Sequence, residues 1–194
     1  MKNDASVAAG LLLIAFAGAD VGAQMPGGEA CKPEKVSPQK QVDFQTAFSA
    51  AEKRARAWQA DVVIARLTHT SLGPIDAEGR SSNWHMVFYS PGTKNTDMIT
   101  IANGMITCWW TPGPAGRLPE LKPDFYRDVK TILAEAAAQG GAALMADGYV
   151  PTLEMSAGAQ GRAYWYVNYS HPTKRSALQV TFDANSGKFN KALK

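Results

Sequence analysis

The chain has 194 residues, of which 45% are hydrophobic and 19% are charged. This composition is typical of a globular protein, and it excludes an intrinsically disordered chain and one that is membrane-spanning throughout. The formal net charge of +3 is too small to indicate nucleic-acid binding. A chain of this length forms one large domain or two small ones.

The N-terminal residues 1–23 are predicted to be a signal peptide. Lys2 precedes an apolar run of 11 residues that begins at Val7, whereas a helix that spans a bilayer needs about 20 residues. Small residues follow this run, and we expect cleavage after Ala23. An uncleaved membrane anchor is the alternative, because Asp4 weakens the basic start of the segment. Export predicts a periplasmic or secreted protein with no stable membrane insertion after cleavage.

Residues 24–41 are rich in Pro, Gly and Lys and are expected to be flexible. The chain has two cysteines, Cys31 and Cys108, and an exported protein folds in a compartment where thiols pair. A disulfide between them is predicted to hold the N-terminal segment against the end of a strand. Two free thiols are the alternative, with Cys108 buried as a small hydrophobic side chain.

Two amphipathic helices are predicted from apolar residues that recur with a 3.6-residue period. The first begins at Phe44, behind an N-cap at Asp43. The second begins behind an N-cap at Asp124 and ends at Gly140. Alternating strand patterns follow each helix, at residues 62–70, 83–90, 97–102 and 105–111 and then at 149–156, 162–170, 176–183 and 187–190.

The two halves of the chain share similar residues at a nearly constant offset. Phe44 precedes Phe125 by 81 residues, and Trp84 precedes Tyr164 by 80 residues. The predicted fold class is therefore α+β, with two helix-plus-antiparallel-sheet repeats of about 80 residues and two modest cores. The expected division is repeat unit one at 42–111, a proline-rich linker at 112–123 and repeat unit two at 124–190.

The turn with the strongest signal is Asn103-Gly104, because a two-residue Asn-Gly loop accepts the positive φ angles of a type I′ hairpin. This turn sets the strand register, so that Ile99 pairs with Cys108 and Met98 pairs with Trp109. The face that carries Ile99 is apolar and is expected to lie under the helix.

The segment from Leu178 to Lys188 resembles the strand-and-turn signature of PepSY-type domains, in which an alternating apolar strand runs into Asp183, a small residue and a glycine turn. A helix followed by an antiparallel sheet, present twice in an exported chain, is also similar to the architecture of beta-lactamase inhibitory protein. The resemblance implies tandem PepSY/cystatin-like units that bind or inhibit an envelope protein without catalysis. The first unit departs from this pattern, because Asn103-Gly104 replaces the longer turn that begins with Asp.

The sequence shows no recognisable catalytic or metal site. His69 and His85 lie in neighbouring predicted strands, but zinc needs three or four ligands and no third has a suitable spacing. There is no Gly-x-Ser-x-Gly motif, and Cys108 does not lie at a helix N-terminus that would activate its thiol. We therefore predict a protein that is not an enzyme, with no catalytic residue, metal or cofactor.

The sequence Asp183-x-Asn185-x-Gly187 starts like a calcium-binding loop, whose twelfth position supplies a carboxylate. Lys194 stands at that position here, so a plain turn is predicted.

Aromatic residues in the predicted strands are the remaining functional signal. Successive side chains of a strand point to opposite faces, so one member of each adjacent aromatic pair lies outside the core. Exposed Trp and Tyr side chains contribute strongly to protein interfaces. The predicted binding residues are Trp84, Met98, Trp109, Tyr164, Trp165 and Tyr166.

These features predict an exported, non-enzymatic protein that binds or inhibits another envelope or secreted protein through the open face of its sheet. One alternative is a small-ligand-binding or hydrolytic enzyme with a curved-sheet cavity, which would place His69 or His85 beside a carboxylate. Another is an immunity protein against an envelope-targeting toxin. The structural alternative is that the sheets, or a homodimer, bury the aromatic face as ordinary core.

Overall fold

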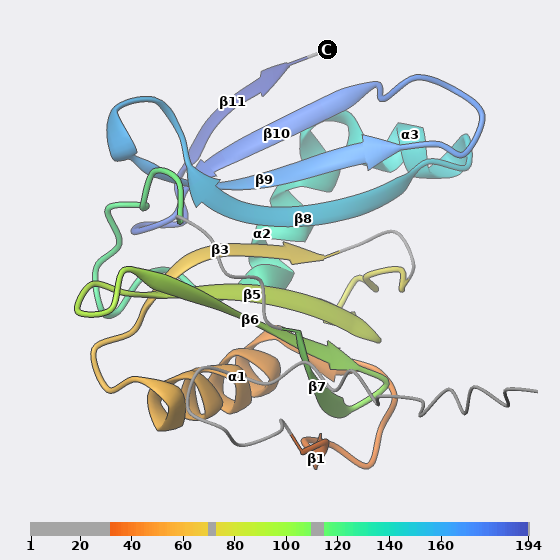
Figure 1. The fold of residues 1–194 in the computed structure, drawn as a ribbon. Coiled ribbons are helices and arrows are strands. Elements are labelled where there is room, and N and C mark those ends of the chain that lie inside the picture. Colours follow the sequence, from red (N-terminus) through yellow and green to blue (C-terminus); the bar gives the residue numbers. More distant parts are fainter. Residues whose placement is uncertain (1–31, 70–72, 110–114, 194) are drawn as a thin grey trace, which may run out of the picture.

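The computed structural model describes residues 32–69, 73–109 and 115–193. The strands of its main sheet are β1 (Glu34–Lys35), β3 (Val63–His69), β5 (Asn83–Ser90), β6 (Asn95–Ala102), β7 (Met105–Trp109), β8 (Val150–Ala157), β9 (Ala163–Ser170), β10 (Leu178–Asp183) and β11 (Phe189–Leu193). They form one antiparallel sheet in the order β1-β7-β6-β5-β3-β8-β9-β10-β11 (Figure 1). The short strands β2 (Val42–Asp43) and β4 (Arg80–Ser81) pair separately.

Two helices pack against the main sheet, α1 (Phe44–Trp58) and α2 (Val129–Ala136). α2 continues through a π-helical turn, η1 (Ala137–Gly141), into α3 (Ala142–Ala146), and a 3₁₀ turn, η2 (Ala159–Gly161), joins β8 to β9. Gly140 has a φ of 112°, which bends the helical run where the sequence predicts a helix end. Within the described residues, no helix has the length and apolarity needed to cross a membrane.

Both helices lie on the same face of the sheet, which we call the inner face. Phe44 of α1 contacts Trp84 of β5, and Ile132 of α2 is buried in the same core as Val180 of β10. The other face, which we call the open face, carries the alternate side chains. Along β5 and β9, buried side chains alternate with half-buried ones over the whole length of each strand. The core therefore lies on one side of the sheet.

The predicted fold class, with two helix-plus-antiparallel-sheet repeats, is wrong. β3 pairs directly with β8, where Leu67 is opposite Met155, so strands from both halves of the chain form one sheet. The hydrophobic core is also continuous, because the ring of Phe44 lies 5.6 Å from Trp84 in β5 and 5.4 Å from Trp165 in β9. One core serves both halves, rather than two modest ones.

The residue matches at an offset of 80 do not mark equivalent positions. Trp84 is fully buried on the inner face, whereas Tyr164 is half-buried on the open face. Likewise, Val87 is half-buried and Val167 is fully buried. A shift of one residue along a strand moves a side chain to the other face, so this alignment pairs core residues with surface residues.

The predicted hairpin at Asn103-Gly104 is confirmed. Ile99 pairs with Cys108 and Met98 pairs with Trp109, as expected. Both turn residues have positive φ, 50° and 77°. A side chain at Gly104 would also collide with the backbone carbonyls of the N-terminal segment, since an added Cβ would lie 2.4 Å from the oxygen of Gln39.

Two predicted connecting segments are bound to the sheet where the structure describes them. In the N-terminal segment, Glu34 pairs with Ile106 of β7. In the proline-rich segment, the side chain of Asn185 accepts a hydrogen bond from the amide of Lys122 and donates one to the carbonyl of Glu120. The predicted signal peptide, Cys31 and the side chain of Cys108 lie outside the described part, so the disulfide stays a prediction.

The N-cap of α1 is confirmed at Asp43, whose carboxylate accepts from the amide of Thr46 at 2.9 Å. The second predicted N-cap, Asp124, is wrong. α2 begins four residues later, and Asp128 caps it by accepting from the amide of Thr131 at 3.0 Å. The amide of Tyr126 donates instead to the carbonyl of Ala184, which keeps this stretch out of the helix.

We expect Asp128→Ala to lower the free energy of unfolding by about 1 kcal/mol, because it leaves helix amides without an acceptor. Asp124→Ala removes an exposed carboxylate that caps no helix, and it should change stability by less than about 0.5 kcal/mol. Urea denaturation of both variants measures the difference. Equal losses from the two substitutions would contradict the assigned start of α2.

Phe44→Ala should lower the free energy of unfolding by about 3–5 kcal/mol, because it leaves a cavity between the two indoles. The adjacent exposed residue provides the control, and Gln45→Ala should change stability by no more than about 0.5 kcal/mol. The measurement is chemical denaturation followed by tryptophan fluorescence. A loss below about 1 kcal/mol for Phe44→Ala would contradict a shared core.

Candidate functional site

Two of the predicted binding residues, Trp84 and Trp165, belong to the core. Both side chains are fully buried on the inner face. The Trp84 indole N–H donates to the carbonyl of Val42 at 2.9 Å, and that of Trp165 donates to the carbonyl of Tyr126 at 3.0 Å. Because their polar atoms are satisfied within the fold, these residues are not available to a partner, and their assignment as binding residues is wrong.

The remaining predicted residues fall into two places on the sheet. Met98 lies in β6, and the backbone register puts Trp109 opposite it in β7, although the side chain of Trp109 lies outside the described part. Tyr164 and Tyr166 lie together in β9. β6 and β9 are separated by β5, β3 and β8, a distance of about 19 Å across the sheet. The structure therefore brings the two tyrosines together and leaves Met98 apart.

The tyrosine pair lies on the open face beside the loop between β8 and β9. The ring centroids of Tyr164 and Tyr166 are 6.1 Å apart, with their planes at 64°. Gly158 makes room for them, because a Cβ at this position would lie 2.8 Å from the ring of Tyr164. Both side chains are half-buried, so each presents part of its ring to solvent.

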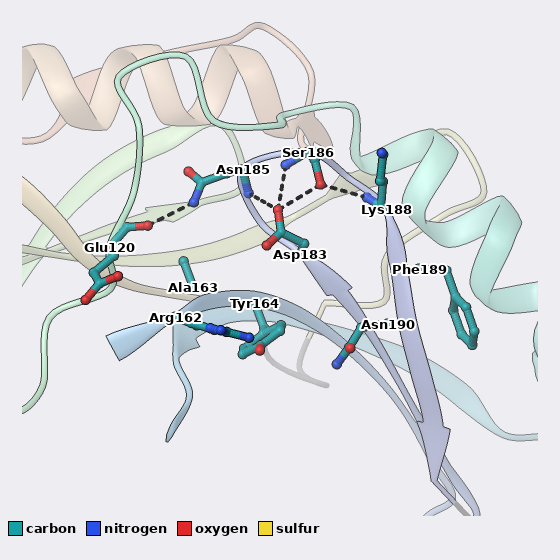
Figure 2. Close-up of a pocket in the computed structure, with 10 residues that line it drawn as sticks. All are labelled: Glu120, Arg162, Ala163, Tyr164, Asp183, Asn185, Ser186, Lys188, Phe189 and Asn190. Carbon is teal, nitrogen blue, oxygen red and sulfur yellow. Dashed lines mark hydrogen bonds between the residues drawn. The ribbon is translucent and has the colours of Figure 1, made fainter. Parts of the chain in front are cut away.

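Two cavities adjoin this pair. The first, of about 380 Å³, lies where β9 meets the β10–β11 turn, and Figure 2 shows its lining residues: Glu120, Arg162, Ala163, Tyr164, Asp183, Asn185, Ser186, Lys188, Phe189 and Asn190. The second, of about 200 Å³, is lined by Gly158, Ala159, Tyr164, Tyr166, Gln179, Thr181, Asn190 and Lys191. Because Tyr164 and Asn190 line both, the cavities are adjacent, and we treat them as one candidate site.

The wall of the first cavity is a rigid turn. One carboxylate oxygen of Asp183 accepts hydrogen bonds from the amide of Asn185 and from both the amide and hydroxyl of Ser186, at 2.8–3.1 Å (Figure 2). Gly187 completes the turn with a φ of 70°. The structure therefore forms a turn at Asp183-x-Asn185-x-Gly187, as expected.

His69 and His85 lie outside this site, and their side chains point to opposite faces of the sheet. His69 faces the core, where its ring contacts Trp84 and bonds the carbonyl of Gly73, and burial lowers its pKa. His85 lies on the open face, and its pKa is lowered by burial and then by the charge of Arg66. Neither lines either of the two cavities above. Within the described ranges, no group of three or more His, Cys, Asp or Glu side chains could hold a metal ion.

A buried carboxylate in β6 was missed from the sequence. Asp97 is 1% exposed, and its oxygens make no hydrogen bond of normal geometry with a described residue, although the backbone amide of Met98 is close enough to oppose the rise of its pKa. Burial raises its pKa to about 6, and the charge of Arg54 in α1 opposes that rise. The signal was present in the strand pattern, since Asp97 lies two residues from Ile99 and so on the same apolar face.

The position of Asp97 predicts a pH-dependent stability. Its pKa is raised from 3.8 to about 6, so the folded state binds this proton more tightly than the unfolded state. The resulting stabilisation is present below about pH 4 and is lost as the pH rises through about 6. Asp97→Asn should therefore be more stable than the native protein at pH 8, by up to ~3 kcal/mol, with little of this gain left at pH 4.

Urea denaturation at both pH values measures this gain. Asp124→Asn, which removes an exposed carboxylate, is the control and should give the same small change at both. A gain for Asp97→Asn that is equal at pH 4 and pH 8 would show that the buried charge is not its cause.

Comparison with known proteins gives a fold likeness and no family. No family model matches the chain, and no curated protein matches it. Among solved structures, the chain is similar to a protein from Clostridium difficile 630 described as a putative lipoprotein, with a TM-score of 0.51 and 9% identity. The match covers 79% of this chain and 96% of that one. At this identity the likeness concerns the fold alone, and membership of the PepSY-type domains is not confirmed.

Proposed function

We propose that this is an exported, non-enzymatic protein that binds another envelope or secreted protein through the open face of its sheet. The observation that carries the proposal is the half-buried pair Tyr164 and Tyr166 on the face that the helices do not cover, with two cavities beside it. Tyrosine offers large contact area with few rotatable bonds, and interfaces are enriched in it. The description of the similar structure as a lipoprotein supports an envelope location.

The aromatic side chains of the inner face, unlike Tyr164 and Tyr166, are used by the core. They pack against one another, as Phe44 does against both indoles, and they leave little apolar surface for a partner. Tyr164 and Tyr166 of β9 are only half-buried. A surface that the fold itself does not need to bury is therefore the place where we expect recognition.

We expect Tyr164→Ala combined with Tyr166→Ala to reduce retention of the partner by about 30-fold or more, because truncation of a central aromatic typically costs at least about 2 kcal/mol of binding. The measurement is capture from an envelope extract on immobilised protein, with bound proteins quantified by mass spectrometry. Tyr89→Ala is the matched control, since Tyr89 lies half-buried in β5, three strands away on the same sheet.

Retention that survives the double substitution, or that Tyr89→Ala abolishes equally, would place binding elsewhere. Capture of no protein at all would overturn the proposed function. An inhibitor of an envelope enzyme and an immunity protein would bind through the same kind of interface. The identity of the captured protein would therefore distinguish these two functions.

A further inference from the structure

We propose that the cavity between Tyr166 and Lys191 is an anion site that receives an Asp or Glu side chain from an extended acidic segment of the partner protein. This inference rests on the proposed function and specifies the chemistry of the partner. Its first support is the lining of the second cavity, where Lys191 is the one charged side chain. Among the lining residues, a carboxylate placed there would meet one positive charge, while the carboxylate of Glu154 lies on the far side of Tyr166, in β8.

The shape of this cavity follows from the strand register. Tyr166 of β9 pairs with Thr181 of β10, and Thr181 pairs with Lys191 of β11, so the three residues form one row across the open face. Neighbouring strands lie about 4.8 Å apart, which places the outer two residues about 10 Å from each other. The short, buried side chain of Thr181 is the floor, and the two long side chains are the walls.

The polar groups around this floor are suited to a carboxylate. Burial raises the pKa of Tyr166, with smaller effects from Glu154 and Tyr164, so its hydroxyl stays protonated and can donate. Asn190 also lines the cavity, and its side-chain amide donates one N–H to the hydroxyl of Thr181 at 3.1 Å and has a second N–H to donate. A carboxylate accepts hydrogen bonds only, and such bonds are strong when one partner is charged.

The first cavity is lined by charges of both signs. Arg162 and Lys188 line it and are exposed, and neither takes part in the ion pairs found among the described residues. The carboxylates of Glu120 and Asp183 balance these two cations, since Asp183 keeps its negative charge while it accepts hydrogen bonds within the turn. Glu154 lies beside Tyr166 but lines neither cavity. The residues that line the two cavities therefore carry three positive and two negative charges, and the excess comes from Lys191.

The edge strand indicates how the partner segment approaches. β11 ends the order of strands, and its side chains are exposed, including Phe189 at 42% and Leu193 at 47%. Its free backbone groups can pair with an extended chain. A second copy is a poor occupant, because antiparallel pairing about the centre of β11 would set Lys191 against Lys191. An acidic heterologous segment has the complementary charge.

Lys191→Glu tests the inference by capture from the envelope extract. We expect the partner to be reduced at least 10-fold, whereas Lys53→Glu, on the exposed side of α1, should change retention by less than 2-fold. Thermal denaturation would check that both variants fold. If the wild type and Lys191→Glu retain the partner equally while the tyrosine variant loses it, the anion site is overturned and the proposed function stands. If nothing is captured, the proposed function fails first.

A second arm needs no partner. Hexaglutamate is the probe, added to ¹⁵N-labelled full-length protein, with hexalysine as the control of opposite charge. We expect shifts of the Asn190 side-chain amide and the Lys191 backbone amide with hexaglutamate, and their loss in Lys191→Glu. The absence of these shifts at millimolar peptide, or the same shifts with hexalysine, would overturn the anion site.

Discussion

The packing of Phe44 between two indoles is the interaction on which the rest of this structure depends. Phe44 is the first residue of α1, and its ring centroid lies 5.6 Å from that of Trp84 in β5 and 5.4 Å from that of Trp165 in β9. These strands come from opposite halves of the chain, so one side chain brings both halves to a single core. Because dispersion and burial favour the densest arrangement of such rings, the two halves form one continuous sheet.

The same constraint determines which side chains remain available. Successive residues of a strand point to opposite faces, so burial of Trp165 puts Tyr164 and Tyr166 on the open face. The indole of Trp165 is fixed further by its bond to the carbonyl of Tyr126. The tyrosine pair therefore cannot rotate into the core without breaking a buried hydrogen bond. Its exposure is a consequence of the core, and it requires no separate stabilisation.

Local patterns in the sequence were sufficient for most of the elements but not for their arrangement. The Asn103-Gly104 turn, the strand periods and the N-cap at Asp43 depend on neighbours in the chain, and these predictions are confirmed. The pairing of β3 with β8 depends on residues about 90 positions apart, and no local signal predicts it. The predicted start of α2 is wrong for a related reason, because a long-range hydrogen bond from the amide of Tyr126 to the carbonyl of Ala184 determines where the helix begins.

The candidate site also has one part that the sequence predicts and one part that it does not. The outward tyrosines followed from alternation, but Asn190 and Lys191 reach them only through the pairing of β11 with β10, which includes a register shift beside Thr181. In the sequence these residues belong to a lysine-rich end that resembles a solvated tail. We assign Lys191 a different role, because the strand that forms a wall of the cavity is also the last strand of the sheet within the described part of the chain. Charge on that edge opposes self-association and favours an acidic partner, so one residue can serve both solubility and recognition.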